Sequence, residues 1–170
     1  MQALNAVLLG LPITLLITLV SFVVGFILAV PLTVALRSRI TIVRLFFRVL
    51  VDFIRGIPII VWLFIIYFGI VIGTFKFKPI PAAIVAFSLI SAAYLAETLR
   101  GGLESVPRGQ WEASEALGLN RSTTFLRIIA PQGFRITSPG IATYLIGLLK
   151  DSSIASTIGV TEMVYYATNY

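Results

Sequence analysis

Three long stretches without charged side chains constrain this sequence more than any other feature. Residues 1–36 contain no Asp, Glu, Lys or Arg, and neither do residues 56–75 or 79–96. A helix that crosses a bilayer needs about 20 mostly apolar residues. The pattern therefore predicts an all-α protein whose helices form a multi-span membrane bundle.

The composition points the same way. Of 170 residues, 58% are hydrophobic and 12% are charged, too few charges to cover a soluble globule of this size. The first apolar stretch has no basic leader and exceeds the roughly 7 to 15 apolar residues of a signal peptide, so we expect it to remain as a membrane helix. No flexible linker or low-complexity tract divides the sequence, so residues 1–170 are expected to form a single transmembrane domain.

Helix positions follow from the apolar runs and the charges between them. We expect spans at about Leu11–Leu36, Val49–Ile72 and 81–98. A fourth span is expected at Ile136–Leu149, extended on its inner side by a preceding helix. Basic and apolar residues alternate from Arg37 to Arg48, which favours an amphipathic helix at the membrane interface over a free loop.

The basic residues predict an orientation, because they gather on the cytoplasmic side of membrane proteins. With the N-terminus outside, the ten arginines lie inside and the three lysines outside. The inner set is Arg37, Arg39, Arg44, Arg48, Arg55, Arg100, Arg108, Arg121, Arg127 and Arg135, and the outer set is Lys76, Lys78 and Lys150. Topology thus explains the net charge of +6 without a nucleic-acid partner.

Several functions are excluded by residues that the sequence lacks. It contains neither Cys nor His, so disulfides, thiol chemistry, imidazole metal sites and His-based catalysis are excluded. No segment follows the GxxxxGK[ST] pattern that binds nucleotide phosphates. We therefore expect no enzyme activity, no cofactor and no metal site, and any ATP must be hydrolysed by another chain.

Ionisable residues near the predicted inner ends of the spans have structural interpretations. Asp52 and Arg55 are three residues apart on one helical face and are expected to pair. Gly56 and Pro58 favour a local kink beside them. Glu97 falls near the far edge of the hydrocarbon core, which indicates an interfacial anchor rather than a proton carrier.

A basic segment between the third and fourth spans predicts two short helices joined by a tight turn. Trp111–Leu117 is long enough for about two helical turns, and Gly118 supplies the left-handed residue that closes them. Ser122 is expected to cap a second helix that Pro131 stops. A helix this short is marginal alone in water, so packing on this chain or in a partner's groove must hold it.

The spacing of this segment resembles the EAA loop of membrane subunits of ATP-driven (ABC) importers. Five residues fall in register with that motif: Glu112, Ala113, Gly118, Ile128 and Pro131. Ser114 replaces its second Ala, and Ala130 replaces its Leu.

This resemblance implies a fold and a set of partners. The fold is that of a type I ABC importer permease, with cytoplasmic coupling helices in a loop at about residues 100–133. The implied coupling residues are Arg108, Trp111, Glu112, Ala113, Ser114, Glu115, Ala116, Leu117, Gly118 and Pro131. The implied partners are two ATP-binding ABC subunits, a second permease subunit, identical or closely related, and an extracytoplasmic substrate-binding protein. The implied location is the bacterial cytoplasmic (inner) membrane.

Three further segments resemble the polar amino acid branch of these permeases. Residues 55–58 are similar to its Arg-Gly-Thr-Pro segment, where a gating role and a simple proline bend are both open. Residues 96–110 also match the branch, and residues 148–154 resemble its Leu-Lys-Asp-Thr-Ser segment. In the family that segment is followed by a re-entrant stretch and one more span, so we expect the final span to be missing from this sequence, which ends at Tyr170.

Charged groups beside the spans are candidates for the substrate path, because they are expensive near lipid. Lys150 and Asp151 offer a cation and an anion to a zwitterionic polar amino acid. Hydroxyl groups of Tyr67, Ser152 and Ser153 complete the predicted path, and Glu162 is a further candidate. The alternative is that these charges are solvated at an outer loop.

Two other classes of function compete with the importer. An ion-coupled secondary transporter is also helical and lacks nucleotide motifs, but it commonly places coupling residues near the bilayer midplane within internal repeats. A membrane enzyme with a Ser-Lys dyad is suggested only by Lys150 beside Ser152 and Ser153.

Overall fold

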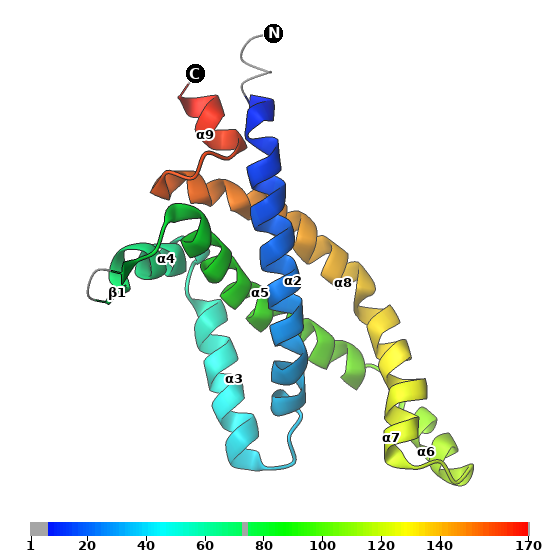
Figure 1. Cartoon of the computed structure of the whole chain (residues 1–170). Coiled ribbons are helices and arrows are strands. Elements are labelled where there is room, and N and C mark those ends of the chain that lie inside the picture. Colours follow the sequence, from blue (N-terminus) through cyan, green and yellow to red (C-terminus); the bar gives the residue numbers. More distant parts are fainter. Residues whose placement is uncertain (1–6, 73–74, 170) are drawn as a thin grey trace.

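The computed structural model describes residues 7–72 and 75–169, and most of them are helical (Figure 1). In chain order the elements are α2 (Leu11–Leu36), α3 (Thr41–Gly56), α4 (Ile59–Phe64), the π-helical η1 (Ile65–Gly69), β1 (Val71–Ile72), β2 (Phe75–Lys76), α5 (Pro79–Glu104), α6 (Arg108–Ala116), α7 (Arg121–Thr124), the π-helical η2 (Phe125–Ile129), α8 (Ala130–Asp151), the 3-10 helical η3 (Ser152–Ile158) and α9 (Met163–Thr168). The two short strands pair antiparallel between η1 and α5. The predicted all-α fold is confirmed, with this small hairpin added.

The close crossing of α2 and α5 forms the centre of the structure (Figure 1). The buried face of α2 consists mainly of small residues at spacings of three and four, among them Ser21, Gly25 and Ala29. A Cβ atom on Gly25 would lie 2.3 Å from the Cβ of Ser91. Small residues let helix backbones approach closely, which is how membrane helices gain packing and interhelical hydrogen bonds. One such bond runs from Ser21 Oγ to the carbonyl of Ile84, at 3.3 Å.

A second close crossing joins the far end of α5 to α8. A Cβ atom on Gly102 would lie 2.0 Å from Thr137 Cγ2 and 2.8 Å from the carbonyl oxygen of Gly133. On the opposite helix, a Cβ atom on Gly133 would meet Leu103 Cδ2 at 2.8 Å. Glycine is thus needed at Gly102 for α8 to lie against α5, whereas an added Cβ at Gly133 would first displace the Leu103 side chain.

The predicted second span, Val49–Ile72, is broken at the predicted kink. The helix begins at Thr41, ends at Gly56 and resumes at Ile59 after a bend of 96°. Ile57 has an extended backbone, as expected of a residue before proline. The predicted kink is therefore confirmed but is much larger than a local bend, and the basic segment predicted as a separate interface helix is largely the first part of α3.

An indole group spans this break. Trp62 Nε1 donates a hydrogen bond to the carbonyl of Ile54 at 3.0 Å, which satisfies one of the carbonyl groups left free at the end of α3.

Within the described residues, two helices are long and apolar enough to cross a membrane: Val7–Leu36 and Pro79–Glu104. The bent pair Thr41–Gly56 and Ile59–Gly69 supplies a third if it is one broken span. Helix α8 has 22 residues, or about 33 Å at a rise of about 1.5 Å per residue. It is less apolar than those helices and is not among the ones apolar enough to cross a membrane, so the fourth span stays a prediction.

Pro131 does not stop a helix, contrary to the prediction. It lies at the second position of α8, directly after the π-helical turn η2, where the irregular hydrogen bonding accommodates a residue without an N–H group. The preceding π-helical turn, η2, joins α7 to α8 without a gap, so residues 121–151 form one continuous helical stretch. The predicted cap is also wrong: Asn120 Oδ1, not Ser122, accepts a hydrogen bond from Thr123 N at 2.8 Å.

Candidate functional site

The predicted turn between α6 and α7 closes as a complete helix cap. Gly118 has a φ of +71°, which confirms the predicted left-handed residue. Its N–H donates to the carbonyl of Glu115 at 2.9 Å, and Leu119 N donates to the carbonyl of Ser114 at 3.0 Å. These two bonds form a Schellman motif, which needs a residue with positive φ at Gly118.

This element, α6 with its turn, presents most of its side chains to the outside. Of the predicted coupling residues, Ser114 is buried, with its hydroxyl donating to the carbonyl of Gln110 at 2.6 Å, and Trp111 is half-buried. The exposed ones are Arg108, Glu112, Ala113, Glu115, Ala116, Leu117, Gly118 and Pro131. Leu117 is 77% exposed at the tip, which is unusual for a large apolar side chain.

A hollow of about 300 Å³ lies beside this tip. Its lining residues are Arg39, Trp111, Glu115, Leu119, Arg121 and Thr124. Arg39 comes from the connection between α2 and α3, which also lies on the cytoplasmic side in the predicted orientation. A second segment of the chain thus contributes to the surface beside the tip. In the sequence, only its charge distinguishes Arg39 from its neighbours. No ion pair within the described residues engages Glu115, Arg39 or Arg121.

A separate cavity of about 460 Å³ lies at the break between α3 and α4. Its lining residues are Arg55, Gly56, Ile57, Pro58, Ile59, Ile90, Tyr94, Tyr144, Gly147, Leu148 and Asp151. They come from the break itself, from α5 and from the C-terminal part of α8. Of the residues predicted for the substrate path, Asp151 is in this set.

An arginine and two tyrosines form a stack on one wall of this cavity. The guanidinium carbon of Arg55 lies 4.8 Å from the centre of the Tyr94 ring. The Tyr94 and Tyr144 rings stack with their centres 5.6 Å apart, and the Tyr144 hydroxyl donates to Ser91 Oγ at 3.0 Å. The predicted ion pair between Arg55 and Asp52 is wrong, because Arg55 instead stacks on an aromatic face of α5.

The other predicted path residues lie outside the lining of this cavity. Lys150 is exposed, and Ser152 and Ser153 donate to the carbonyls of Leu149 and Lys150, each at 2.7 Å. Tyr67 packs against the core on η1. The two serine hydroxyl groups therefore bond to the local backbone, the Tyr67 side chain packs against the core, and the place of all three residues in a path stays a prediction.

Glu162 is almost completely buried and caps a helix. Its two carboxylate oxygens accept hydrogen bonds from Val164 N at 2.9 Å and Tyr165 N at 2.8 Å, at the start of α9. Met163 N donates to Thr14 Oγ1 at 3.2 Å, which ties α9 to α2 (Figure 1). Glu162 thus has a structural function where α9 packs beside the start of α2.

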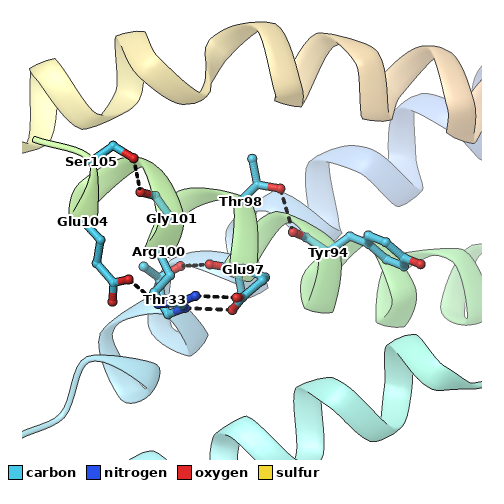
Figure 2. Close-up of polar contacts among 9 residues, drawn as sticks. Thr33, Tyr94, Glu97, Thr98, Arg100, Gly101, Glu104 and Ser105 are labelled. Carbon is cyan, nitrogen blue, oxygen red and sulfur yellow. Dashed lines mark hydrogen bonds and ion pairs between the residues drawn. The ribbon is translucent and has the colours of Figure 1, made fainter.

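A third polar cluster lies near the end of α5. Figure 2 shows Arg100 between Glu97 and Glu104 on one face of that helix, forming ion pairs with both. Thr33 of α2 reaches across to donate to the carbonyl of Ala96 at 3.2 Å. The interpretation of Glu97 as an interfacial anchor stays a prediction.

Sequence reasoning missed most of the cavity wall. Tyr94 and Tyr144 carry the detectable signal, since each places a hydroxyl group within an apolar helix. What no pattern indicated is that the bend after Gly56 brings Arg55 to the same cavity as Asp151.

Comparisons with known proteins agree with this architecture. The family model described as "Binding-protein-dependent transport system inner membrane component" matches residues 21–170. The chain is 41% identical over 158 residues to the probable amino-acid ABC transporter permease protein YckA of Bacillus subtilis, covering 93% of this chain and 70% of that protein. It is 40% identical over 154 residues to the L-cystine transport system permease protein TcyB of the same organism, covering 91% and 66%.

A solved structure gives the same result. The crystal structure of an amino acid ABC transporter with histidines matches with a TM-score of 0.91 at 28% identity, covering 98% of this chain and 78% of that chain. The chain thus spans about two thirds to four fifths of these proteins. The matches confirm the resemblance read from the Glu112–Pro131 spacing and do not favour a secondary transporter. With the family match over residues 21–170 and this agreement in fold, the chain belongs to the inner-membrane permease components of binding-protein-dependent (ABC) transport systems.

Proposed function

We propose that this chain lines one half of the translocation path of an ATP-driven importer for polar amino acids. In this proposal the chain is a single transmembrane domain that does not itself hydrolyse ATP. Its partners are two ATPase subunits, a second permease, identical or closely related, and an extracytoplasmic substrate-binding protein. The names of its relatives support an amino acid cargo.

The observation that carries this proposal is the continuity of one helical stretch between two exposed sites. The tip of α6 and its turn lie just before residue 121, and the cavity lies against the end of α8 at Asp151. The stretch 121–151 joins them without a break, and α8 alone is about 33 Å long. A push on the tip therefore reaches the cavity wall along one continuous helical path, which the π-helical turn η2 and Pro139 allow to bend.

The surface of the tip suits a partner's groove. Leu117 offers an apolar anchor, and Glu112 is exposed with no hydrogen bond or ion pair to the described residues. Closure of the ATPase subunits on ATP would move this element and so open the cavity to opposite sides of the membrane in turn. The positive-inside pattern supports placing the tip in the cytosol and the N-terminus outside.

The test uses two substitutions at Gly118 in the assembled importer. A Cβ atom there would meet nothing within 4 Å, so a side chain changes the turn and its outer surface rather than the core. Gly118→Val forbids the left-handed backbone, whereas Asn tolerates it, so Gly118→Asn is the matched control. We expect Gly118→Val to lower amino acid uptake by at least about tenfold and to uncouple ATP hydrolysis from substrate, given about 1–3 kcal/mol of backbone strain.

The control should keep most of the uptake. Equal uptake by Gly118→Val and the unmodified importer, measured in proteoliposomes with ATP inside, would refute the coupling function of this turn. Uptake that survived ATP depletion but not proton or sodium uncouplers would favour the secondary transporter instead.

A further inference from the structure

We propose that the cavity at the α3–α4 break binds the main-chain groups of a zwitterionic amino acid, with Arg55 on its carboxylate and Asp151 on its ammonium. This inference rests on the proposed function and deepens it by assigning which side chain binds the carboxylate and which binds the ammonium group of the transported amino acid. It replaces the pair that the sequence suggested, Lys150 and Asp151, because Lys150 is not among the cavity-lining residues.

The first support is that two opposite charges line one cavity without pairing. No ion pair within the described residues joins Arg55 to Asp151, or either of them to another side chain, and Arg55 interacts with Glu97 of α5 only at longer range. Placing a charge near lipid without a partner is unfavourable, so such groups are commonly paired or functional. A ligand that carries both an anion and a cation would satisfy both residues at once.

The second support is the state of the arginine. Arg55 Nε is buried and has no hydrogen-bond partner. The guanidinium lies over the Tyr94 ring, an interaction that limits its movement. Planar guanidinium groups bind carboxylates through two parallel hydrogen bonds, and a fixed guanidinium loses little conformational entropy when it does so.

The third support is the rest of the lining. The cavity volume of about 460 Å³ lies within the range of roughly 300–1,000 Å³ typical of small-molecule sites. Apart from Arg55 and Asp151, every lining residue is apolar, aromatic or glycine. Such a wall cannot select strongly between cargo side chains by charge. The cavity should therefore recognise the groups that all α-amino acids share and tolerate different side chains.

The test measures binding to the purified permease–ATPase complex in nanodiscs, without the extracytoplasmic binding protein. The probe is whichever of the twenty labelled amino acids the unmodified importer takes up fastest. It is compared with its carboxamide, which lacks the carboxylate, and with its N-acetyl derivative, which lacks the ammonium. Arg55→Gln and Asp151→Asn are the test variants.

Two exposed charges of α3 outside the cavity lining provide matched controls, Arg48→Gln and Asp52→Asn. Assembly of every variant is checked by size-exclusion chromatography and by basal ATPase activity.

We expect a crossed pattern of preferences. The unmodified complex should prefer the amino acid over both derivatives by roughly 10- to 100-fold, the value of one hydrogen-bonded charge. Arg55→Gln should abolish the preference over the carboxamide and keep the preference over the N-acetyl derivative, and Asp151→Asn should do the reverse. The two controls should keep both preferences within about twofold, because they leave the lining intact.

Other outcomes overturn the inference. If Arg55→Gln and Asp151→Asn weakened all three ligands equally, or changed none, the two residues would not read the main chain. If Lys150→Gln rather than Arg55→Gln abolished the carboxylate preference, the assignment of the cation would be wrong. In both cases uptake by the unmodified importer would leave the proposed function standing, whereas uptake of none of the twenty amino acids would overturn both.

Discussion

The crossing of α2 with α5 and the tip of α6 differ in how their glycines are used. At Gly25 a single added carbon would lie 2.3 Å from Ser91, so glycine there is required by the neighbouring helix. At Gly118 an added carbon would meet nothing within 4 Å, and glycine is required by the backbone angle alone. The α2–α5 crossing is packed within this chain, whereas the tip of α6 is exposed.

This difference separates the scaffold from the surface that a partner must cover. Close packing with small residues makes the α2–α5 crossing resistant to deformation, since packed interiors transmit strain instead of absorbing it. The tip has a fixed shape, given by its cap, but few neighbours within the chain. A rigid scaffold with one exposed element of fixed shape is suited to a protein whose conformational change is driven by a partner subunit.

The largest effect expected from this comparison is at Gly25. Gly25→Leu places a whole side chain where there is no space for its first carbon, and helix crossings cannot separate without losing the packing of α5. We expect the protein to fail to accumulate in the membrane, measured by fluorescence-detection size-exclusion chromatography.

The matched control is the next residue, Val24→Leu, which alters an exposed apolar position of the same helix. It should accumulate normally. Equal accumulation of the two variants would mean that α2 does not approach α5 as closely as the structure has it.

The second effect is at the tip, where function should change while stability does not. Leu117→Ala removes a side chain that is 77% exposed and has little to lose within the chain. If an ATPase groove covers it, uptake should fall by roughly five- to thirtyfold, the range for about 1–2 kcal/mol of lost contact at a partly buried anchor. The melting temperature of the isolated permease should stay within about one degree.

Ile42→Ala offers the comparison, because Ile42 is 80% exposed on α3 and does not line the hollow beside the tip. A loss of uptake as large as that of Leu117→Ala would remove the special status of the tip.

The third effect compares two adjacent glycines of one helix. Gly101 and Gly102 both gain helix propensity on substitution by alanine, by roughly 0.5–1 kcal/mol. An added Cβ meets nothing within 4 Å at Gly101, but at Gly102 it would lie 2.0 Å from Thr137. Gly101→Ala should therefore raise the melting temperature slightly, and Gly102→Ala should lower it through overpacking of about 1–3 kcal/mol.

Thermal denaturation in detergent, followed by circular dichroism, measures both. A stabilised Gly102→Ala variant would show that α5 and α8 separate easily at this crossing.

Local rules predicted the tip well but not the route of the chain beyond it. The spacing of Trp111–Leu117 and Gly118 is enough to define a capped helix end, because the cap is made within six residues. The fate of Pro131 depends on the π-helical turn before it, and a proline that follows a polar helix start cannot be told from one that ends a helix.

The cavity shows a different limit. Gly56 and Pro58 indicate a kink in the sequence, but they do not indicate that the bend reaches 96°. That bend, with α5 and α8 packed against it, places Arg55, Tyr94 and Asp151 around one space. Their proximity is a property of helix packing over long sequence separation, and the local pattern of one helix does not contain it.

The smallest effect tests the corrected helix start. Asn120 Oδ1 accepts the bond from Thr123 N, so Asn120→Ala should cost about 1 kcal/mol and fray the four residues of α7. Ser122, the residue predicted as the cap, forms no such bond. Ser122→Ala should therefore leave the protection of backbone amides against hydrogen exchange unchanged or slightly raise it. Amide hydrogen exchange of residues 121–129 measures both variants. This segment joins the tip to α8. If Asn120→Ala exchanges faster here and not in α5, the helical connection between the tip and the cavity can unfold locally while the packing of α5 is unchanged. If the two variants exchanged alike, the Asn120 cap would not stabilise the helical connection between the tip and α8.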